Sequence, residues 1–118
     1  MKLRTPARKI LMKTFKVFDF TGHGAIAIEH GQKLYRVIHP HILNGELVQL
    51  DFTGIEFLTT AFVGTAIGQL LKDIPRQTLD ELIEFAALSE DKRDMIQRVM
   101  DRAYKWYFYE QQNQTWTN

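Results

Sequence analysis

Asp51 is the carboxylate of this chain whose position best suits a catalytic group. It lies near the end of the alternating apolar stretch 47–52, and α/β proteins place their chemistry at the carboxyl ends of such strands. Thr53 and Gly54 offer another explanation, because an Asp followed three positions later by a Gly is typical of a type I turn. An aspartate at the first position of that turn accepts backbone amides. We therefore predict that Asp51 forms a turn, and an enzyme built on Asp51 and the histidines ranks third among our hypotheses.

The four histidines do not form a pattern typical of a metal site. His39 and His41 are separated by Pro40. His23 lies in a glycine-rich turn and His30 on a predicted helix, and none has an obvious acidic partner at ligand spacing. The chain also lacks a phosphate-binding glycine loop with lysine, a Gly-x-Ser-x-Gly motif and any cysteine. We expect no metal, no cofactor and no catalytic activity.

Two adjacent hydroxyls, on Thr59 and Thr60, precede an apolar pattern with helical spacing that continues to about Lys72. The first turn of a helix leaves backbone amides unpaired, and a Thr at its start accepts one of them. A helix cap therefore explains one of these two hydroxyls without any modification.

Strands and helices alternate along the chain. The apolar patterns predict strands over 14–20, 47–52 and 82–87. They predict helices over 25–44, over 60–72 and from Ser89, a good N-cap, to about Trp106. Pro40 should stop or kink the first helix near His39. The βαβαβα order favours a small single-domain α/β sandwich, in which helices pack on a mainly parallel sheet.

Length and composition indicate one domain that folds alone. The chain has 118 residues, of which 45% are apolar, enough for a single core. It has no cysteine, which fits a reducing compartment. No apolar run approaches a membrane span, and the basic N-terminus is not followed by the apolar stretch of a signal peptide. We expect a cytoplasmic protein that does not bind membranes.

Charge divides the chain into a basic N-terminal arm (1–13), an α/β domain (14–109) and a polar C-terminal tail (110–118). Residues 1–16 hold six bases and no acid, whereas the remaining residues hold nine bases and fourteen acids. Such an arm can attract nucleic acid or anionic lipid, but six charges spread over sixteen residues are more often a solvated terminus or one that folds back on the acidic body. The candidate nucleic-acid contacts are Lys2, Arg4, Arg8, Lys9 and Lys13.

Five aromatic residues gather near the C-terminus. They are Tyr104, Trp106, Tyr107, Phe108 and Tyr109. Neighbours in this group cannot all face one side of a helix. Either most of the rings cover the edges of the core, or an exposed cluster serves a partner or a homodimer.

The stretch from Leu50 to Phe62, LDFTGIEFLTTAF, resembles the strand-turn-helix signature of STAS-like domains of unknown function. These are relatives of the STAS domains in anti-sigma-factor antagonists, and the likeness extends more loosely from about Phe15 to Trp106. Antagonists of this kind are not enzymes; they bind an ATPase-type kinase that phosphorylates a Ser or Thr where the second helix begins. The resemblance therefore implies a STAS-like fold, a bacterial or phage origin, and a kinase-like ATPase or sigma regulator as partner. It places the phospho-acceptor on Thr60, with Thr59 as the second candidate.

The leading hypothesis is a non-catalytic, anti-sigma-factor-antagonist-like regulatory module. It would dock a protein partner through the turn after strand 47–52 and the start of the next helix. The candidate contacts are Thr53, Glu56, Thr59, Thr60, Val63 and Thr65. The alternative is a nucleic-acid-binding or phage/defence accessory protein that binds a larger complex through the basic arm. Binding of that kind should fall steeply with salt and be lost when residues 1–13 are removed.

Overall fold

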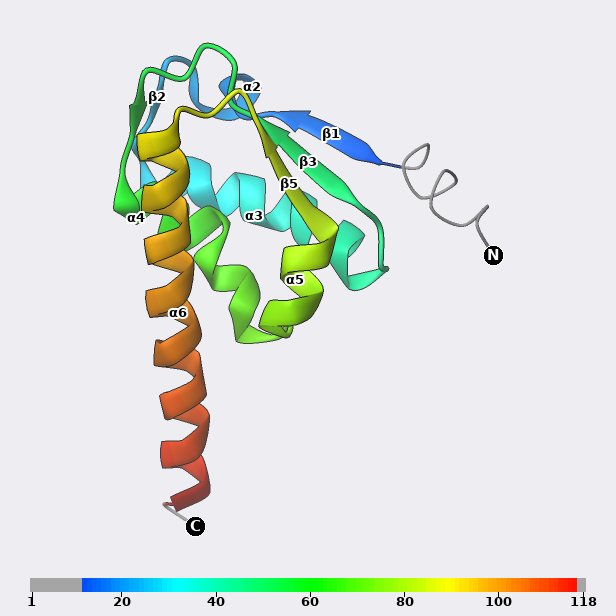
Figure 1. Ribbon diagram of the computed structural model, residues 1–118, viewed down its shortest axis with the longest axis vertical. Coiled ribbons are helices and arrows are strands. Elements are labelled where there is room, and N and C mark those ends of the chain that lie inside the picture. Colours follow the sequence, from blue (N-terminus) through cyan, green and yellow to red (C-terminus); the bar gives the residue numbers. More distant parts are fainter. Residues whose placement is uncertain (1–11, 117–118) are drawn as a thin grey trace.

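Three parallel strands form the main sheet of the protein (Figure 1). The computed structural model describes residues 12–116, with side chains for residues 12–110. The strands are β1 (Lys13–Lys16), β3 (Val48–Asp51) and β5 (Ile83–Ala86), in the order β1-β3-β5. The predicted parallel sheet is confirmed.

The helices gather on one side of these strands (Figure 1). They are α2 (Phe18–Thr21), α3 (Ile28–Leu43), α4 (Thr60–Ala66), the 3-10 helix η1 (Gly68–Lys72), α5 (Arg76–Leu82) and α6 (Glu90–Trp116). One crossover runs from β1 through α3 to β3, and the next runs from β3 through α4, η1 and α5 to β5. Right-handed crossovers that continue in one direction across a sheet leave their helices on the same face.

The core lies between the sheet and the helices. Val48 and Leu50 of β3 are fully buried there, together with Leu34 and Ile38 of α3 and Phe62 of α4. By alternation and register, the opposite face of the sheet carries Thr14, Lys16, Gln49, Asp51 and Glu84. The α/β sandwich therefore has two layers, and the outer face of its sheet is polar. Within residues 12–116, no helix combines the length and the apolarity needed to cross a membrane.

The first strand is shorter than predicted. The last pairing of β1 joins Lys16 to Asp51, where β3 also ends. Val17 then adopts helical dihedral angles (φ −58°, ψ −36°) and leads into α2. The prediction of a strand over 14–20 is wrong beyond Lys16 because the helical geometry of Val17 turns the chain out of the sheet and into α2.

Helix α3 passes through Pro40, although the sequence predicts a stop or kink there. Proline lacks the amide that would bond to the preceding turn. Ile38 and Ile42, on either side of Pro40, are both buried on the face that packs into the core. Burial of this continuous face explains why the helix runs on to Leu43.

The second predicted helix, 60–72, is divided in two. Helix α4 ends at Ala66, Ile67 leaves regular helical geometry (φ −115°), and the chain continues as η1. Gly64 and Gly68 favour this change because glycine is a weak helix former. A Cβ at Gly68 would lie 3.2 Å from the Cβ of Ala103, so glycine also permits α6 to approach closely.

Residues 76–82, which the sequence predicts as a polar connection leading to a strand, form α5 instead. Leu79 and Leu82 are buried at helical spacing. Arg76 Nη1 donates a hydrogen bond to Asp101 Oδ1 at 3.0 Å, which ties α5 to α6. Strand β5 follows α5 directly at Ile83.

Helix α6 begins at the predicted cap and ends later than predicted. The amide of Lys92 donates to Ser89 Oγ at 3.3 Å. The helix continues to Trp116, so residues 110–116 of the predicted polar tail are helical. Glu and Gln residues in this segment are good helix formers, which supports its extension. The C-terminal part of α6 projects beyond the rest of the domain (Figure 1).

Candidate protein-docking site

Asp51 shapes the turn that follows β3. Its Oδ1 accepts hydrogen bonds from the amide of Thr53 at 3.0 Å and from the hydroxyl of Thr53 at 2.7 Å. The bond from the Thr53 hydroxyl, followed by that from the Thr53 amide, lowers the pKa of the Asp51 carboxyl. The predicted turn-forming role of Asp51 is confirmed.

The turn itself lies one residue later than predicted. The amide of Ile55 donates to the carbonyl of Phe52 at 3.0 Å, and Gly54 has a φ of 83°. A positive φ at the third position is typical of a type II turn, so the predicted type I turn over 51–54 is wrong. A Cβ at Gly54 would lie only 3.1 Å from the Phe18 ring, which also requires glycine.

A short second sheet, absent from the predicted elements, positions the residues after the turn. β2 (Gly24–Ala25) pairs with β4 (Phe57–Leu58) in parallel, with Gly24 opposite Phe57. Flanking bonds extend this ladder: Glu56 N–H donates to His23 O at 2.8 Å, and Thr59 N–H donates to Ala25 O at 3.1 Å. The segment leading into α4 is therefore held against the segment leading into α3.

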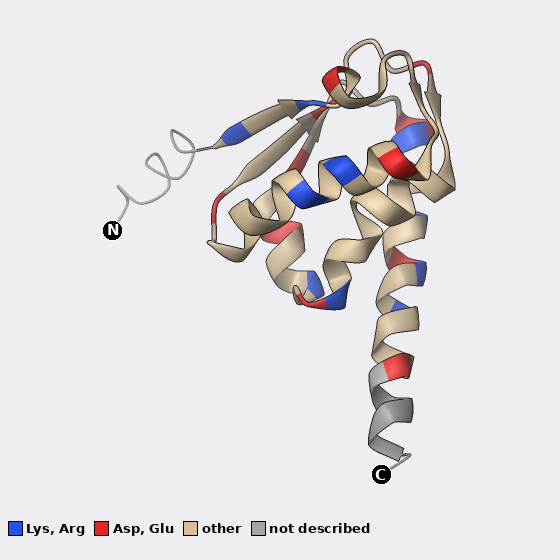
Figure 2. Cartoon of the chain, turned by 180° about the vertical axis from the view of Figure 1, so that it is seen from behind, with Lys and Arg blue, Asp and Glu red and all other residues tan. Residues whose placement is uncertain are grey.

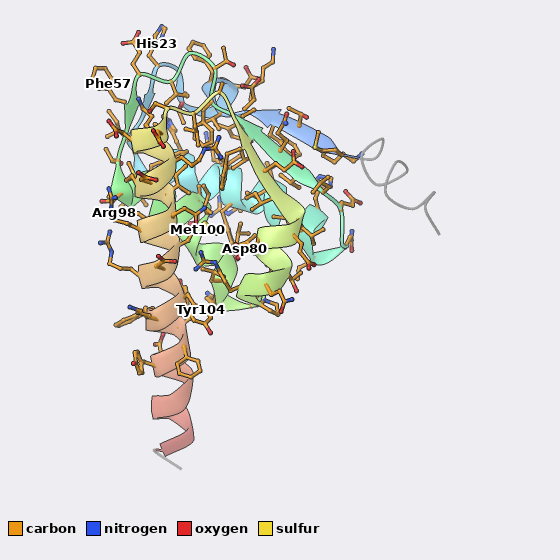
Figure 3. All side chains as sticks on the ribbon, in the orientation of Figure 1. His23, Phe57, Asp80, Arg98, Met100 and Tyr104 are labelled. Carbon is orange, nitrogen blue, oxygen red and sulfur yellow. The ribbon has the colours of Figure 1, made fainter. Side chains whose placement is uncertain are left out.

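This ladder turns large apolar side chains towards solvent. Ala25 is fully buried, whereas Phe57 is 60% exposed and Ile26 is 51% exposed. Residues opposite each other or two apart on a strand share a face, so Ile26 and Phe57 lie on the same outer face of the ladder. Ile28, at the start of α3, is 56% exposed. Figure 3 shows Phe57 and His23 at the same end of the molecule.

Thr59 and Thr60 have different environments. Thr59 Oγ1 accepts a hydrogen bond from the amide of Phe62 at 3.1 Å and donates one to the carbonyl of Ile26 at 3.2 Å. Thr59 is therefore the N-cap of α4, and its hydroxyl is engaged twice. Thr60 is the first residue of the helix and is exposed. The more accessible of the two candidate phospho-acceptors is Thr60.

The structure brings some of the predicted contact residues together and separates others. Thr53 and Glu56 are exposed on the loop between β3 and β4. Val63 is completely buried in the core, so it cannot contact a partner as predicted. Thr65 is half-buried, donates to the carbonyl of Ala61 at 2.9 Å, and faces α3. Val63 is excluded because it lies on the face of α4 that packs into the core. Contact of Thr65 with a partner stays a prediction.

We define the docking end as the exposed residues around this ladder and the start of α4. They are Ile26, Ile28, Thr53, Glu56, Phe57 and Thr60. The sequence reasoning missed the three apolar members of this set. The signal that could have identified them is the pair of isoleucines, Ile26 and Ile28, just after the glycine turn at 22–24.

A groove of about 320 Å³ begins at the docking end and follows the contact between α4 and α6. Thr60, Ala61 and Gly64 line it from α4, and Arg102 and Trp106 line it from α6. The small residues of α4 leave this groove open. A partner that covers Thr60 can therefore also reach α6.

Three histidines lie beside a carboxylate, although none has an obvious acidic partner at ligand spacing in the sequence. His39 Nε2 lies 2.9 Å from Asp73, and His41 Nδ1 lies 2.6 Å from Glu46. His23 Nδ1 lies 3.8 Å from Glu56. The partners of His39 and His23 are more than thirty positions away in the chain, which is why spacing in the sequence did not show them. Among the described residues, no three metal-binding side chains form a group.

Most of the basic arm lies outside the residues that the structure describes. Lys2, Arg4, Arg8 and Lys9 lie outside the described residues, and Lys13 is exposed where β1 begins. Nucleic-acid binding by the arm stays a prediction.

Of the aromatic residues, Tyr104, Trp106, Phe108 and Tyr109 are exposed and Tyr107 is half-buried. Burial, and then the charge of Glu110, raises the pKa of Tyr107.

Comparison with known families supports the fold. Residues 30–93, more than half of the chain, match the family described as a STAS-like domain of unknown function (DUF4325). The chain belongs to this family. The matched region of this STAS-like domain contains β3, β4, α4 and β5, and therefore the turn and the helix start of the docking end. No match was found among curated proteins or among solved structures.

Proposed function

We propose that this STAS-like domain is a non-catalytic regulatory module that binds a protein partner through its docking end. The observation that carries the proposal is the exposure of Phe57, Ile26 and Ile28 beside the accessible hydroxyl of Thr60. Large apolar side chains that cluster on a surface mark interaction sites, because their hydration is unfavourable until a partner covers them. STAS-like membership supports a regulatory or protein-interaction role.

The polar residues of the docking end suit the rim of such an interface. Thr53 and Glu56 are exposed on the same loop that leads to Phe57, and protein interfaces commonly have an apolar centre with a polar rim. The turn and ladder hydrogen bonds hold the backbone of this loop in place. A loop that is already ordered loses little conformational entropy when it binds.

Thr60 gives the module a means of regulation. Phosphorylation would add about −1.5 to −2 charges to the docking end where α4 begins. An interface that packs on Phe57 would then have to desolvate this charge or supply a cation for it. The partner we propose is a kinase-like ATPase or a sigma regulator, and phosphorylation of Thr60 would weaken its binding. We place the interaction in the cytoplasm, in line with a chain that has no cysteine.

Matched surface variants test the proposal. Ile28 and Leu43 lie at opposite ends of α3 and are 56% and 55% exposed, so Leu43→Ser is a control that removes a similar apolar surface elsewhere. The wild type and each variant would be used for affinity purification from the organism that encodes the protein. We expect one stoichiometric partner with the wild type and Leu43→Ser, and its loss with Phe57→Ser and Ile28→Ser. Equal recovery by all four proteins would contradict the proposal.

A further inference from the structure

The face of α6 that points away from the domain has a charge pattern that complements itself. Asp91, Asp94, Arg98, Arg102, Lys105 and Tyr109 are all exposed. Their spacings of three or four residues average 3.6, so they form one straight stripe along the helix. We call these six residues the α6 stripe.

The α6 stripe lies opposite the face of α6 that packs on the core. Ile96 and Met100 are buried, and each lies two positions from a member of the stripe, which corresponds to about 200° of rotation along a helix. Figure 3 shows Arg98 pointing away from the rest of the domain, whereas Met100 points towards it. Nothing in the described part of the chain covers this stripe, because all its members are exposed.

The charges of the α6 stripe are separated along the helix. Acids occupy its N-terminal part and bases its C-terminal part, within the mixed charge that Figure 2 shows along α6. None of the stripe's charged residues forms an ion pair with another described residue, whereas Asp101 of the same helix pairs with Arg76. Five exposed charged groups therefore remain available to a second molecule.

We propose that the α6 stripe is the interface of an antiparallel homodimer. With Arg98 at the two-fold axis, Asp94 lies level with Arg102 of the second copy, and Asp91 lies level with Lys105 of the second copy. Two-fold symmetry forms each pair twice, which gives four ion pairs between the two helices. A parallel arrangement would instead place acids beside acids and bases beside bases. The two domains would lie on opposite sides of the helix pair.

Arg98 is the unfavourable member of this arrangement, because the two copies of its charge meet at the axis. Asp94 lies one turn before it, so each guanidinium group has a carboxylate of its own helix within one turn. Tyr109 lies at the level of Ala87 of the second copy, in the loop before its α6. There its exposed ring, and that of Trp106 nearby, would add apolar contact to the ion pairs.

This inference goes beyond the proposed function, since it concerns α6, which contributes no residue to the docking end, although Arg102 and Trp106 also line the groove that begins there. Sedimentation velocity of the wild type from micromolar to millimolar concentration should show the mass rising towards twice the 13.8 kDa of one chain. Asp94→Arg and Arg102→Glu should each weaken dimerisation about tenfold or more, because each creates two like-charge contacts. Arg36→Glu, on the exposed face of α3, is the control for a charge reversal outside the stripe.

Two further samples distinguish direct pairing from a general effect of charge. The double variant Asp94→Arg/Arg102→Glu should recover dimerisation, because it exchanges the two partners. An equimolar mixture of Asp94→Arg and Arg102→Glu should form a heterodimer, because every pair then joins opposite charges. Equal melting temperatures of the variants would show that they are folded. The proposal would be overturned if the wild type stays monomeric throughout or if the single variants dimerise like the wild type. It would also be overturned if neither the double variant nor the mixture dimerises.

Discussion

Thr59 joins the start of α4 to the segment before α3, because its hydroxyl accepts the amide proton of Phe62 at 3.1 Å and donates to the carbonyl of Ile26 at 3.2 Å. The neighbouring hydroxyl of Thr60 is exposed at the first position of the helix. One threonine therefore stabilises the fold, and the other is available to a partner or a kinase. The sequence alone could not assign these roles, since either residue suits a helix cap.

The two threonines should respond differently to alanine. We expect Thr59→Ala to lower the free energy of unfolding by about 1 to 2 kcal/mol, because it removes the cap of α4. Thr60→Ala should change it by less than about 0.5 kcal/mol, as is usual for exposed positions. Urea denaturation measures both values, and Thr59→Ser, which keeps the hydroxyl, is the control. A larger loss for Thr60→Ala than for Thr59→Ala would contradict the assigned cap.

Thr60→Glu should reduce partner affinity much more than stability. Its charge would enter the docking end at an exposed site, so the free energy of unfolding should change by less than about 0.5 kcal/mol. Affinity for the partner, measured by calorimetry, should fall about tenfold or more because the charge must be desolvated. Gln77→Glu, near the start of α5, adds the same charge elsewhere and should leave affinity unchanged. Wild-type affinity of Thr60→Glu would exclude regulation at this residue.

Two glycine substitutions should have opposite effects. A Cβ at Gly31 would lie 3.0 Å from the carbonyl oxygen of Phe62 and 3.1 Å from Cβ of Thr65, so Gly31→Ala should push α3 away from α4. We expect a loss of about 1 to 3 kcal/mol from this overpacking. At Gly64 the nearest atom, Val99 Cγ1, is 3.9 Å away, so Gly64→Ala should gain about 0.5 to 1 kcal/mol of helix propensity. Thermal denaturation of both variants would show whether the signs differ.

Asp51 should contribute stability that depends on pH. Hydrogen bonds from Thr53 lower the pKa of the Asp51 carboxyl in the folded protein. These bonds therefore stabilise the ionised carboxyl more than the protonated one. The contribution is fully present above the unfolded pKa of about 3.9 and is lost as the pH falls through the lower folded pKa. Asp51→Ala should cost about 1 kcal/mol at pH 7 and less at pH 3. A difference in unfolding free energy that is the same at both pH values would disprove this role of the charge.

The sequence predicts the parallel strands well and the connections between them less well. Alternation of Val48, Leu50 and Phe52 places β3 correctly, because one buried face is enough to define a strand. The predicted stop or kink near Pro40 is wrong, because burial of Ile38 and Ile42 outweighs the tendency of proline to break a helix. The α5 helix is missed because its stabilising contact, Arg76 to Asp101, joins residues far apart in the chain.

The sequence indicates which segment of the chain holds the candidate site but not which residues are exposed there. The turn and the two threonines are evident from residues 51–60, and the family match includes them. Exposure of Phe57 and Ile26 depends on pairing between β2 and β4, two-residue strands with no periodic pattern of their own. Val63 was wrongly included, because packing on α3 and α6 sets the rotation of α4 about its axis and points this side chain into the core.

Amide hydrogen exchange of the partner complex tests the docking end most directly. If the partner packs on Phe57 and Thr60, amides of residues 53–62 should exchange more slowly in the complex than in the free protein, and so should those of residues 26–28. Amides near Leu43, at the far end of α3, should be unchanged. Protection restricted to other surfaces, such as residues 104–110 or the outer face of the sheet, would contradict the central claim.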